Sequence, residues 1–236
     1  MSAGGERRPA SVAARDAGRP LLLAHRGAHG DEFGHAENSL PALLATLSGG
    51  FDGVEFDVRF SRDGVPVVVH DETLARTHAD TRPVREISAD ELQRLGVPAL
   101  SKVLAALPRT LFLDLELKVP PLPSFAPTIR EWRGDDAERL VISSFDEVAL
   151  REVGASSPDW PRWLNVEVAA PNTLARARSI GVVGISVEKG LLGSTFVAEA
   201  QAAGFELAVW TLRTRKDLEH LSYPGLVAAC VEGEAR

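Results

Sequence analysis

Short apolar segments of strand length recur along the chain, and most are separated by stretches with the apolar spacing of helices. The nine strand candidates are residues 21–25, 53–59, 65–70, 110–117, 139–145, 164–168, 183–188, 206–212 and 226–231. The helix candidates are residues 39–50, 89–95, 101–108, 146–154, 173–181, 194–204 and 215–221. This alternation predicts parallel strands joined by crossover helices.

The order and length of these elements favour an α/β barrel of the TIM type over an open sheet. The chain has 236 residues, close to the roughly 250 that are typical of an eight-stranded (β/α)8 barrel. The first candidate turn, HRGAHG at residues 25–30, lacks the G-x-G-x-x-G spacing of dinucleotide-binding open sheets. An open sheet of the Rossmann type stays the alternative.

One strand exceeds the eight that a barrel needs, and the extra strand follows the second one. No helix fits between Arg59 and Val67, and Asp63-Gly64 is a strong signal for a two-residue hairpin turn. We therefore predict a β-hairpin in which residues 65–70 run antiparallel to residues 53–59. This register would place His70 directly opposite Asp57, with Glu55 on the same face.

Composition and charge narrow the class of protein. The chain is 44% hydrophobic with a net charge of −7 and has no basic run, which argues against nucleic acid as a partner. No apolar stretch approaches the roughly 18–20 residues of a membrane span. Residues 1–20 have no apolar signal core and are predicted to be a disordered leader before a single domain, residues 21–236. A single cysteine, Cys230, favours a cytoplasmic location.

Carboxylates interrupt two strands that are otherwise apolar. Glu55 and Asp57 share one face of their strand, a pattern that by itself is more typical of a solvated face. The sequence DLELK repeats it, with Glu116 and Lys118 on one face. Three carboxylates without Cys or His spacing predict an oxygen-rich site for Ca²⁺ or Mg²⁺, with Glu55, Asp57 and Glu116 as ligands. Asp114 is either a further ligand or a neighbour of the ligands.

Two histidines complete a set of groups suited to phosphoryl chemistry. His25 and Arg26 end the first strand, and His70 ends the hairpin strand. A divalent ion with Arg26 and Lys118 would neutralise a phosphate, while two imidazoles can serve as general acid and general base. His29 and His35 in the following loop are expected to be solvated.

With these residues the chain resembles the glycerophosphodiester phosphodiesterase family of the barrel superfamily that includes phosphatidylinositol-specific phospholipases C. The shared motifs, in order, are HRG (25–27), EN (37–38), GVEFDV (53–58), DG (63–64), VVVHD (67–71), TLARTH (73–78), VPALSKVL (97–104), LDLELK (113–118), ISSFD (142–146) and VWTL (209–212). The final segment departs from the family, because LVAACVEGEAR lacks its Thr-Asp-x-Pro ending. The segment after His70 is short, which predicts a reduced insertion subdomain.

The resemblance implies metal binding by Glu55, Asp57 and Glu116, acid/base roles for His25 and His70, and phosphate contacts from Arg26 and Lys118. It makes Trp210 a candidate wall of the substrate pocket. Glu37 is ranked as a contact at the rim or a neighbour of the site, and Asn38 and Ser39 as turn and helix-capping residues.

The implied reaction converts a glycerophosphodiester and water into glycerol 3-phosphate and an alcohol. Two rivals remain: a lysophospholipase D or other phospholipase-type barrel phosphodiesterase, and a pseudoenzyme that only binds phosphodiesters. The visible loops are polar, which argues against insertion into a membrane. The sequence leaves open the head group, the choice between the two ions, the role of each histidine and the oligomeric state.

Overall fold

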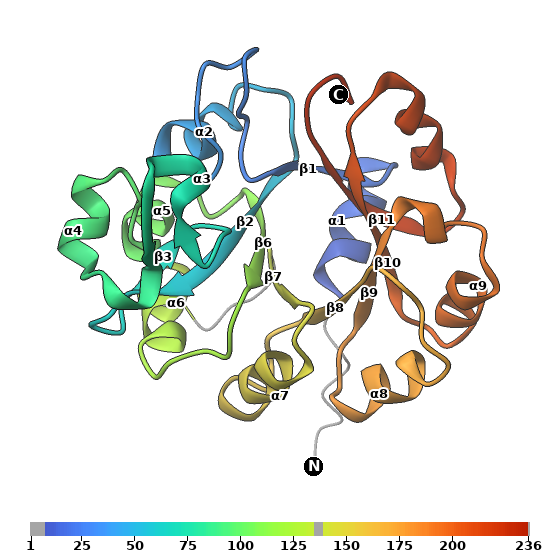
Figure 1. Cartoon of the computed structure of the whole chain (residues 1–236). Coiled ribbons are helices and arrows are strands. Elements are labelled where there is room, and N and C mark those ends of the chain that lie inside the picture. Colours follow the sequence, from blue (N-terminus) through green and yellow to red (C-terminus); the bar gives the residue numbers. More distant parts are fainter. Residues whose placement is uncertain (1–7, 135–138, 236) are drawn as a thin grey trace.

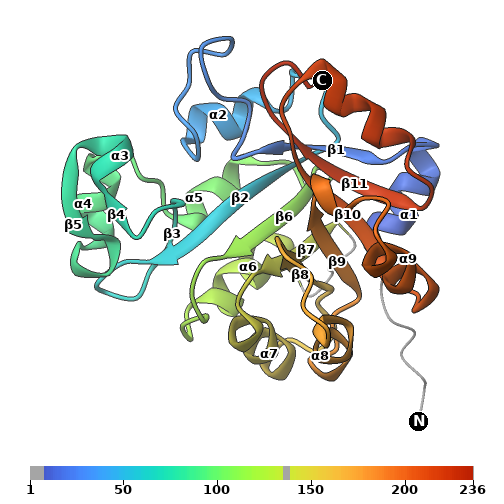
Figure 2. The same ribbon diagram turned by 45° about the vertical axis from the view of Figure 1, so that its right-hand side comes forward.

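A closed barrel of parallel strands forms the centre of the computed structural model, which describes residues 8–134 and 139–235. The sheet has nine strands, of which β3 (Pro66–Val68) is antiparallel, so that eight parallel strands form the ring. Strand β1 pairs with both β2 and β11, which closes it (Figures 1 and 2). The ring strands are β1 (Leu21–His25), β2 (Gly53–Phe60), β6 (Phe112–Leu117), β7 (Leu140–Ser144), β8 (Arg162–Val166), β9 (Gly184–Glu188), β10 (Glu206–Leu212) and β11 (Leu226–Val231). The predicted barrel with an extra hairpin strand is confirmed.

The register of the hairpin differs from the prediction by one residue. Val58 pairs with Val68 and Phe60 with Pro66, and the N–H of Ser61 donates to the carbonyl of Val65 at 3.0 Å. The loop therefore has three residues, Arg62 to Gly64, and it ends with Gly64 at φ 76°. Such loops are common where a glycine can adopt the left-handed conformation.

The predicted opposition of His70 and Asp57 is therefore wrong. The N–H of Val69 donates to the carbonyl of Asp57 at 3.0 Å, which places Val69 opposite Asp57. A slip of one residue would turn His70 to the other face if the strand continued. Strand β3 ends at Val68, however, so alternation along the strand does not fix the direction of His70.

Helices cover the barrel in the positions that the apolar spacing predicted, with one exception. The α-helices between ring strands are α2 (Leu40–Ala45), α5 (Leu100–Ala106), α6 (Phe125–Arg133), α7 (Glu147–Ser156), α8 (Thr173–Ser179) and α9 (Thr195–Ala202). Two 3₁₀ helices accompany them, η2 (Lys189–Leu191) and η3 (Arg215–Ser222). Helix α6 was not predicted because prolines crowd the segment before it. No helix among the described residues has the length and apolarity to cross a bilayer.

A small subdomain follows β3 and stands to one side of the barrel in both views (Figures 1 and 2). It contains β4 (Thr73–Leu74), α3 (Ala75–His78), β5 (Asp80–Pro83), η1 (Val84–Glu86) and α4 (Ala89–Arg94). Its apolar residues pack with Val67 and Val69 in a cluster of their own. The subdomain thus forms one wall beside the strands that carry the carboxylates.

The N-terminal leader is not wholly disordered, because residues Pro9–Ala17 form helix α1. Ala10 is buried in one cluster with Leu23, Phe112 and other residues of the barrel interior. The buried carboxylate of Glu206, at the start of β10, accepts the N–H of Ser11 at 2.8 Å. Residues 1–7 of the predicted leader lie outside the described residues.

Candidate active site

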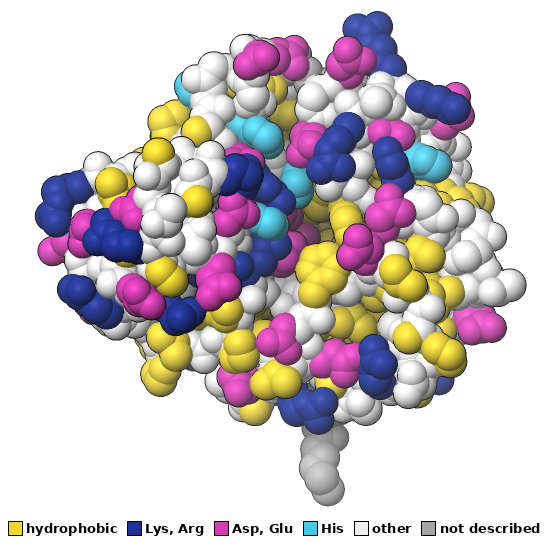
Figure 3. Space-filling view, viewed as in Figure 1, with side chains coloured by type: hydrophobic (Ala, Val, Ile, Leu, Met, Phe, Trp, Pro, Cys, Tyr) yellow, Lys and Arg dark blue, Asp and Glu magenta, His cyan; other side chains and the backbone are white. Residues whose placement is uncertain are grey.

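The predicted site residues converge at the carboxyl ends of β1, β2 and β6. His25 pairs in register with Glu55 across β1 and β2, and Asp57 pairs with Glu116 across β2 and β6. A cavity of about 240 Å³ lies there, and its lining includes seven of the eight predicted residues: His25, Arg26, Glu55, His70, Glu116, Lys118 and Trp210. The eighth, Asp57, is buried beneath the lining. Histidine, basic and acidic side chains gather around the central hollow of this face (Figure 3).

Three carboxylates form a compact group, which we call the carboxylate cluster: Glu55, Asp57 and Glu116. One oxygen of each lies within 4.8 Å of the others, and all three residues are buried. Glu55 Oε2 accepts the backbone N–H of Arg26 at 3.1 Å, whereas no described residue donates to its buried Oε1. Burial, together with the neighbouring charges of Asp57 and Glu116, raises the pKa of Glu55 well above its usual value.

Asp57 is the carboxylate that stays ionised. Burial disfavours its charge, but the ammonium of Lys118 and the guanidinium of Arg26 outweigh that effect and lower the pKa of Asp57. Lys118 Nζ lies 2.9 Å from Oδ1, and Arg26 Nε lies 3.3 Å from Oδ2. The amide of Asn38 also donates to Oδ2 at 2.7 Å, so Asn38 holds Asp57 rather than serving only the local turn.

The pKa values of Glu116 and Asp114 shift in the opposite direction, upward. Burial and the charge of Asp57 raise the pKa of Glu116, although Lys118 donates a hydrogen bond to it. Burial also raises the pKa of Asp114 to about 7, although the hydroxyl of Ser143 donates to it at 2.6 Å. Removing several carboxylates from water without enough cations produces such shifts. A divalent cation fits this group, because it would supply the missing charge and a partner for Glu55 Oε1.

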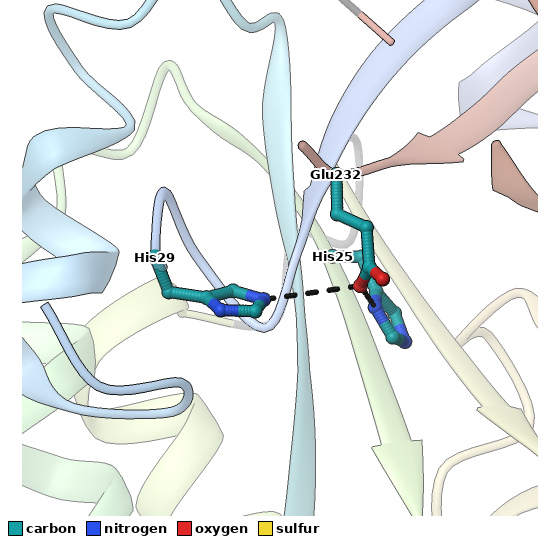
Figure 4. A group of neighbouring side chains, drawn as sticks. All are labelled: His25, His29 and Glu232. Atoms are coloured by element: carbon teal, nitrogen blue, oxygen red, sulfur yellow. Dashed lines mark hydrogen bonds and ion pairs between the residues drawn. The ribbon is translucent and has the colours of Figure 1, made fainter. Parts of the chain in front are cut away.

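Glu232, directly after β11, holds His25. Because Ala24 pairs with Val231, the next residues on the two strands are His25 and Glu232. His25 Nδ1 lies 2.6 Å from Glu232 Oε2, and Arg213 binds the other carboxylate oxygen. His29 Nε2 approaches Oε2 to 3.8 Å from another side (Figure 4). His29 is therefore largely enclosed rather than solvated, with 20% of its side chain exposed.

Asp71, the next residue in the chain, holds His70. His70 Nδ1 lies 2.7 Å from Asp71 Oδ1, and Arg76 Nε donates to Oδ2 at 2.7 Å. Arg76 also donates to both oxygens of Glu37. Glu37 accepts a further hydrogen bond from Arg26 at 2.9 Å, which links this arrangement to the carboxylate cluster.

The two carboxylates fix the tautomers of the histidines. Hydrogen bonds and ion pairs outweigh burial, lowering the pKa of Asp71 and lowering that of Glu232 to about 2. Both are ionised at neutral pH and can only accept hydrogen bonds, so each imidazole must donate through Nδ1. Burial lowers the pKa of both histidines and so favours the neutral rings, and each neutral ring that donates through Nδ1 has a lone pair at Nε2, which is the state required of a general base.

Aromatic side chains form another part of the cavity wall. Trp210 lines the cavity, and its indole N–H donates to the carbonyl of Ser186 at 3.1 Å. Phe145 meets Trp210 edge to face at 5.4 Å between ring centroids and is 47% exposed. These two rings give the cavity an apolar part, and the ammonium of Lys118 lies 5.9 Å from the centroid of the Phe145 ring.

Two other sequence-based interpretations are resolved by the local structure. Ser39 caps helix α2, because its hydroxyl accepts the N–H of Ala42. Gly27 has φ 83°, and a Cβ there would lie 2.7 Å from the backbone carbon of Ala42. The glycine of HRG therefore permits close packing of α2 against the turn, and the turn in this way fixes Arg26 above the carboxylate cluster.

Comparisons with known proteins agree with this arrangement. The model of the glycerophosphoryl diester phosphodiesterase family matches residues 25–231. A curated glycerophosphodiester phosphodiesterase of Caldanaerobacter subterraneus subsp. tengcongensis is 25% identical over 228 residues, which are 88% of this chain and 92% of that protein.

Solved structures share the fold along nearly the whole chain. One is an Oleispira antarctica phosphodiesterase in complex with the product sn-glycerol-3-phosphate, with a TM-score of 0.79, 25% identity and coverage of 92% of this chain and 94% of that one. Another is the glycerophosphodiester phosphodiesterase of Thermotoga maritima, with a TM-score of 0.75, 22% identity and coverage of 90% and 94%.

Proposed function

The chain belongs to the glycerophosphoryl diester phosphodiesterase family, and from that premise we propose that it hydrolyses glycerophosphodiesters to glycerol 3-phosphate and an alcohol. The observation that carries the proposal is the convergence, on one cavity, of three buried carboxylates and two histidines that are each held by an ionised carboxylate. The Oleispira relative, whose structure contains sn-glycerol-3-phosphate, supports the choice of product.

We further propose that the enzyme depends on Ca²⁺ or Mg²⁺ held by Glu55, Asp57 and Glu116. Oxygen ligands without sulfur suit these hard ions. When bound, such an ion would neutralise charge on the phosphate and lower the pKa values of the ligands. Arg26 and Lys118 line the same cavity and would contact the phosphate oxygens.

The two histidines would then move the protons. One Nε2 takes the proton of the glycerol 2-hydroxyl, whose oxygen forms a bond to phosphorus while the bond to the leaving alcohol breaks. The other histidine, protonated, gives its proton to that alcohol. Water then attacks the cyclic phosphate with the two histidines in exchanged roles, and glycerol 3-phosphate is released.

The two rival functions are less well supported. A pseudoenzyme would be expected to lack a histidine or a ligand, and this chain retains all of the predicted residues. An enzyme acting on lipids in a membrane would need apolar loops at the mouth. The predicted cytoplasmic location remains part of the proposal, and the buried, unpaired Cys230 fits a reducing compartment.

A substrate and metal screen tests the proposed function. The full chain is treated with chelator and then incubated with glycerophosphocholine, glycerophosphoglycerol or lysophosphatidylcholine, with and without Ca²⁺ or Mg²⁺. Release of glycerol 3-phosphate is measured with a coupled enzyme, and release of choline from the two choline-containing substrates is measured in parallel. We expect activity on the first two substrates that chelation abolishes and one of the ions restores. Full activity after exhaustive chelation would exclude the metal, and choline release from lysophosphatidylcholine alone, with lysophosphatidic acid as the other product, would favour the rival enzyme.

The variant Glu55→Gln tests the ligand set directly. We expect at least about tenfold weaker metal binding by calorimetry, with an unchanged fold, because the neutral amide resembles the protonated carboxyl that burial favours at this position. Glu234→Gln is the matched control, since Glu234 is exposed and does not line the cavity. Equal metal affinity in the two variants would remove Glu55 from the site.

A further inference from the structure

A groove of about 680 Å³ lies beside the active-site cavity and shares Lys118 with it. Residues 59–62, from the end of β2 and its turn, form one side. Glu72, Val84 and Arg85 form the side that belongs to the small subdomain. Because Lys118 belongs to both linings, the groove and the cavity adjoin at this side chain.

Basic side chains dominate the charge of this groove, although the whole chain is acidic at −7. Its lining contains Arg59, Arg62 and Arg85 but only one acid, Glu72. The fourth cation, Lys118, is already paired with the carboxylate cluster and is not counted here. The groove therefore has an excess of positive charge, which attracts anions.

Two of the three arginines, Arg62 and Arg85, have only weak contacts and can accept an anionic partner, whereas the third is fixed. Arg59 donates through Nε to the carbonyl of His70 at 2.7 Å, which directs it to the catalytic side of the groove. Arg85 pairs with Glu72 at 2.8 Å, but both side chains are 66% exposed, and exposed pairs of this kind are weak. Glu86, outside the lining, lies 3.7 Å from Arg85, and its carbonyl is 3.5 Å from Arg62 Nη1.

We propose that the groove binds a second phosphate group carried by the leaving alcohol. This inference rests on the proposed function, because the alcohol leaves from a phosphodiester bound at the carboxylate cluster. Arginine is the side chain best suited to phosphate, through paired N–H donors. Val119 and Leu122, which is 42% exposed, give the groove an apolar part against which the carbon skeleton of the alcohol packs.

A matched pair of substrates tests the proposal. Glycerophosphoinositol and glycerophosphoinositol 4-phosphate differ only in the phosphate of the leaving alcohol, and a third substrate, bis(glycerophospho)glycerol, carries the second phosphate as a diester. The ratio of kcat/KM for each phosphorylated substrate over glycerophosphoinositol is measured in the metal-loaded enzyme. We expect a ratio of about 10 at low salt, falling as salt screens the exposed charges.

The double variant Arg62→Gln/Arg85→Gln should bring this ratio to about 1 without changing kcat/KM for glycerophosphoinositol. Arg82→Gln is the matched control, because Arg82 lies in the same subdomain, pairs with Asp80 and Glu91, and does not line the groove. A wild-type ratio of 1 or less, or a ratio unchanged in the double variant, would overturn the groove assignment alone. If the enzyme hydrolyses none of the three substrates, the proposed function is overturned instead.

Discussion

Two arms of the active site present a histidine in the same way but are built differently. In each arm, as we call the histidine with its partners, an imidazole donates through Nδ1 to one oxygen of a carboxylate, and an arginine donates to the other oxygen. The His25 arm joins residues 207 positions apart, at the seam where β11 meets β1. The His70 arm is local, since Asp71 is the next residue and Arg76 lies five positions after Asp71.

The difference predicts unequal rigidity. His25 ends a ring strand, and only 13% of its side chain is exposed. His70 lies beyond the end of β3 and is 32% exposed. Packing and strand pairing hold the first histidine, whereas mainly its own hydrogen bonds hold the second. The carboxylate of the His25 arm should therefore act on its histidine mainly through its charge, whereas the carboxylate of the His70 arm also has to hold its histidine in place.

The largest effects should come from removing either imidazole. His25→Ala and His70→Ala should each lower kcat by about 10² or more, because each would remove a proton donor and acceptor. The loss should be greater for His25, since water reaches the more exposed His70 position more easily. The double variant should lose much less than the product of the two losses, because both groups serve one reaction.

Rapid-quench measurement of a single turnover at saturating metal checks this prediction. His220→Ala serves as the control, because His220 does not line the cavity. Near-normal turnover of His70→Ala would show that His70 takes no part in proton transfer and that the two arms do not share a catalytic role.

The next largest effects should come from the two carboxylates. In the His25 arm, burial lowers the pKa of the imidazole, and the hydrogen bond that His25 donates to Glu232 is the strongest opposing influence. In the His70 arm, burial also lowers the pKa, but Asp57 opposes it more than Asp71 does. We expect Glu232→Gln to lower kcat about tenfold and Asp71→Asn about threefold.

The pH profile distinguishes a positioning role from a merely structural one. Loss of the negative charge should lower the pKa of the adjoining histidine, so the corresponding limb of the kcat profile should move to lower pH, further for Glu232→Gln than for Asp71→Asn. A lower melting temperature with an unmoved pH profile would mean that Glu232 only stabilises the fold. Equal shifts in the two variants would contradict the stronger electrostatic influence of Glu232 on its histidine.

The same contrast explains what the sequence could predict. Local patterns were sufficient for the barrel, the hairpin strand and the convergence of Glu55, Asp57 and Glu116, because these follow from strand alternation and motif order. Asp71 stands beside His70 in VVVHD, so its proximity could be read from the sequence although its hydrogen bond could not. Glu232 carried no such signal, since its role depends on the register between the first and last ring strands.

Two errors have different origins. A hairpin register depends on whether the turn has two or three residues, and Asp63-Gly64 is compatible with both, which shifted the predicted partner of Asp57 by one position. Helix α1 was missed because its alanines alternate with charged residues and show no clear apolar pattern. Their packing against the barrel interior, and the contact with Glu206, are visible only in the folded structure. The first error concerns contacts within the hairpin itself, whereas the contacts that decide the second lie far from the segment in the sequence.

The smallest expected effect concerns stability and pH at the seam between β1 and β11. Burial raises the pKa of Glu232, but His25 and Arg213 lower it overall, from an ordinary 4.5 to about 2. Because the folded pKa lies below the ordinary value, the ionised carboxylate stabilises the fold fully above about pH 4.5 and loses that contribution as pH falls toward about 2.

Allowing for screening at the exposed Arg213, we expect a difference in the free energy of unfolding of about 1 kcal/mol, or about 2–4 °C in Tm, between wild type and Glu232→Gln near pH 7. Calorimetry from about pH 7 down to about pH 3 should show this gap closing, whereas for Asp71→Asn, whose contacts are local and more exposed, the gap should be smaller throughout. A difference in Tm that stays constant or widens in acid would show that Glu232 does not stabilise the seam through its charge. Packing and strand pairing would then be the sole source of the greater rigidity of the His25 arm.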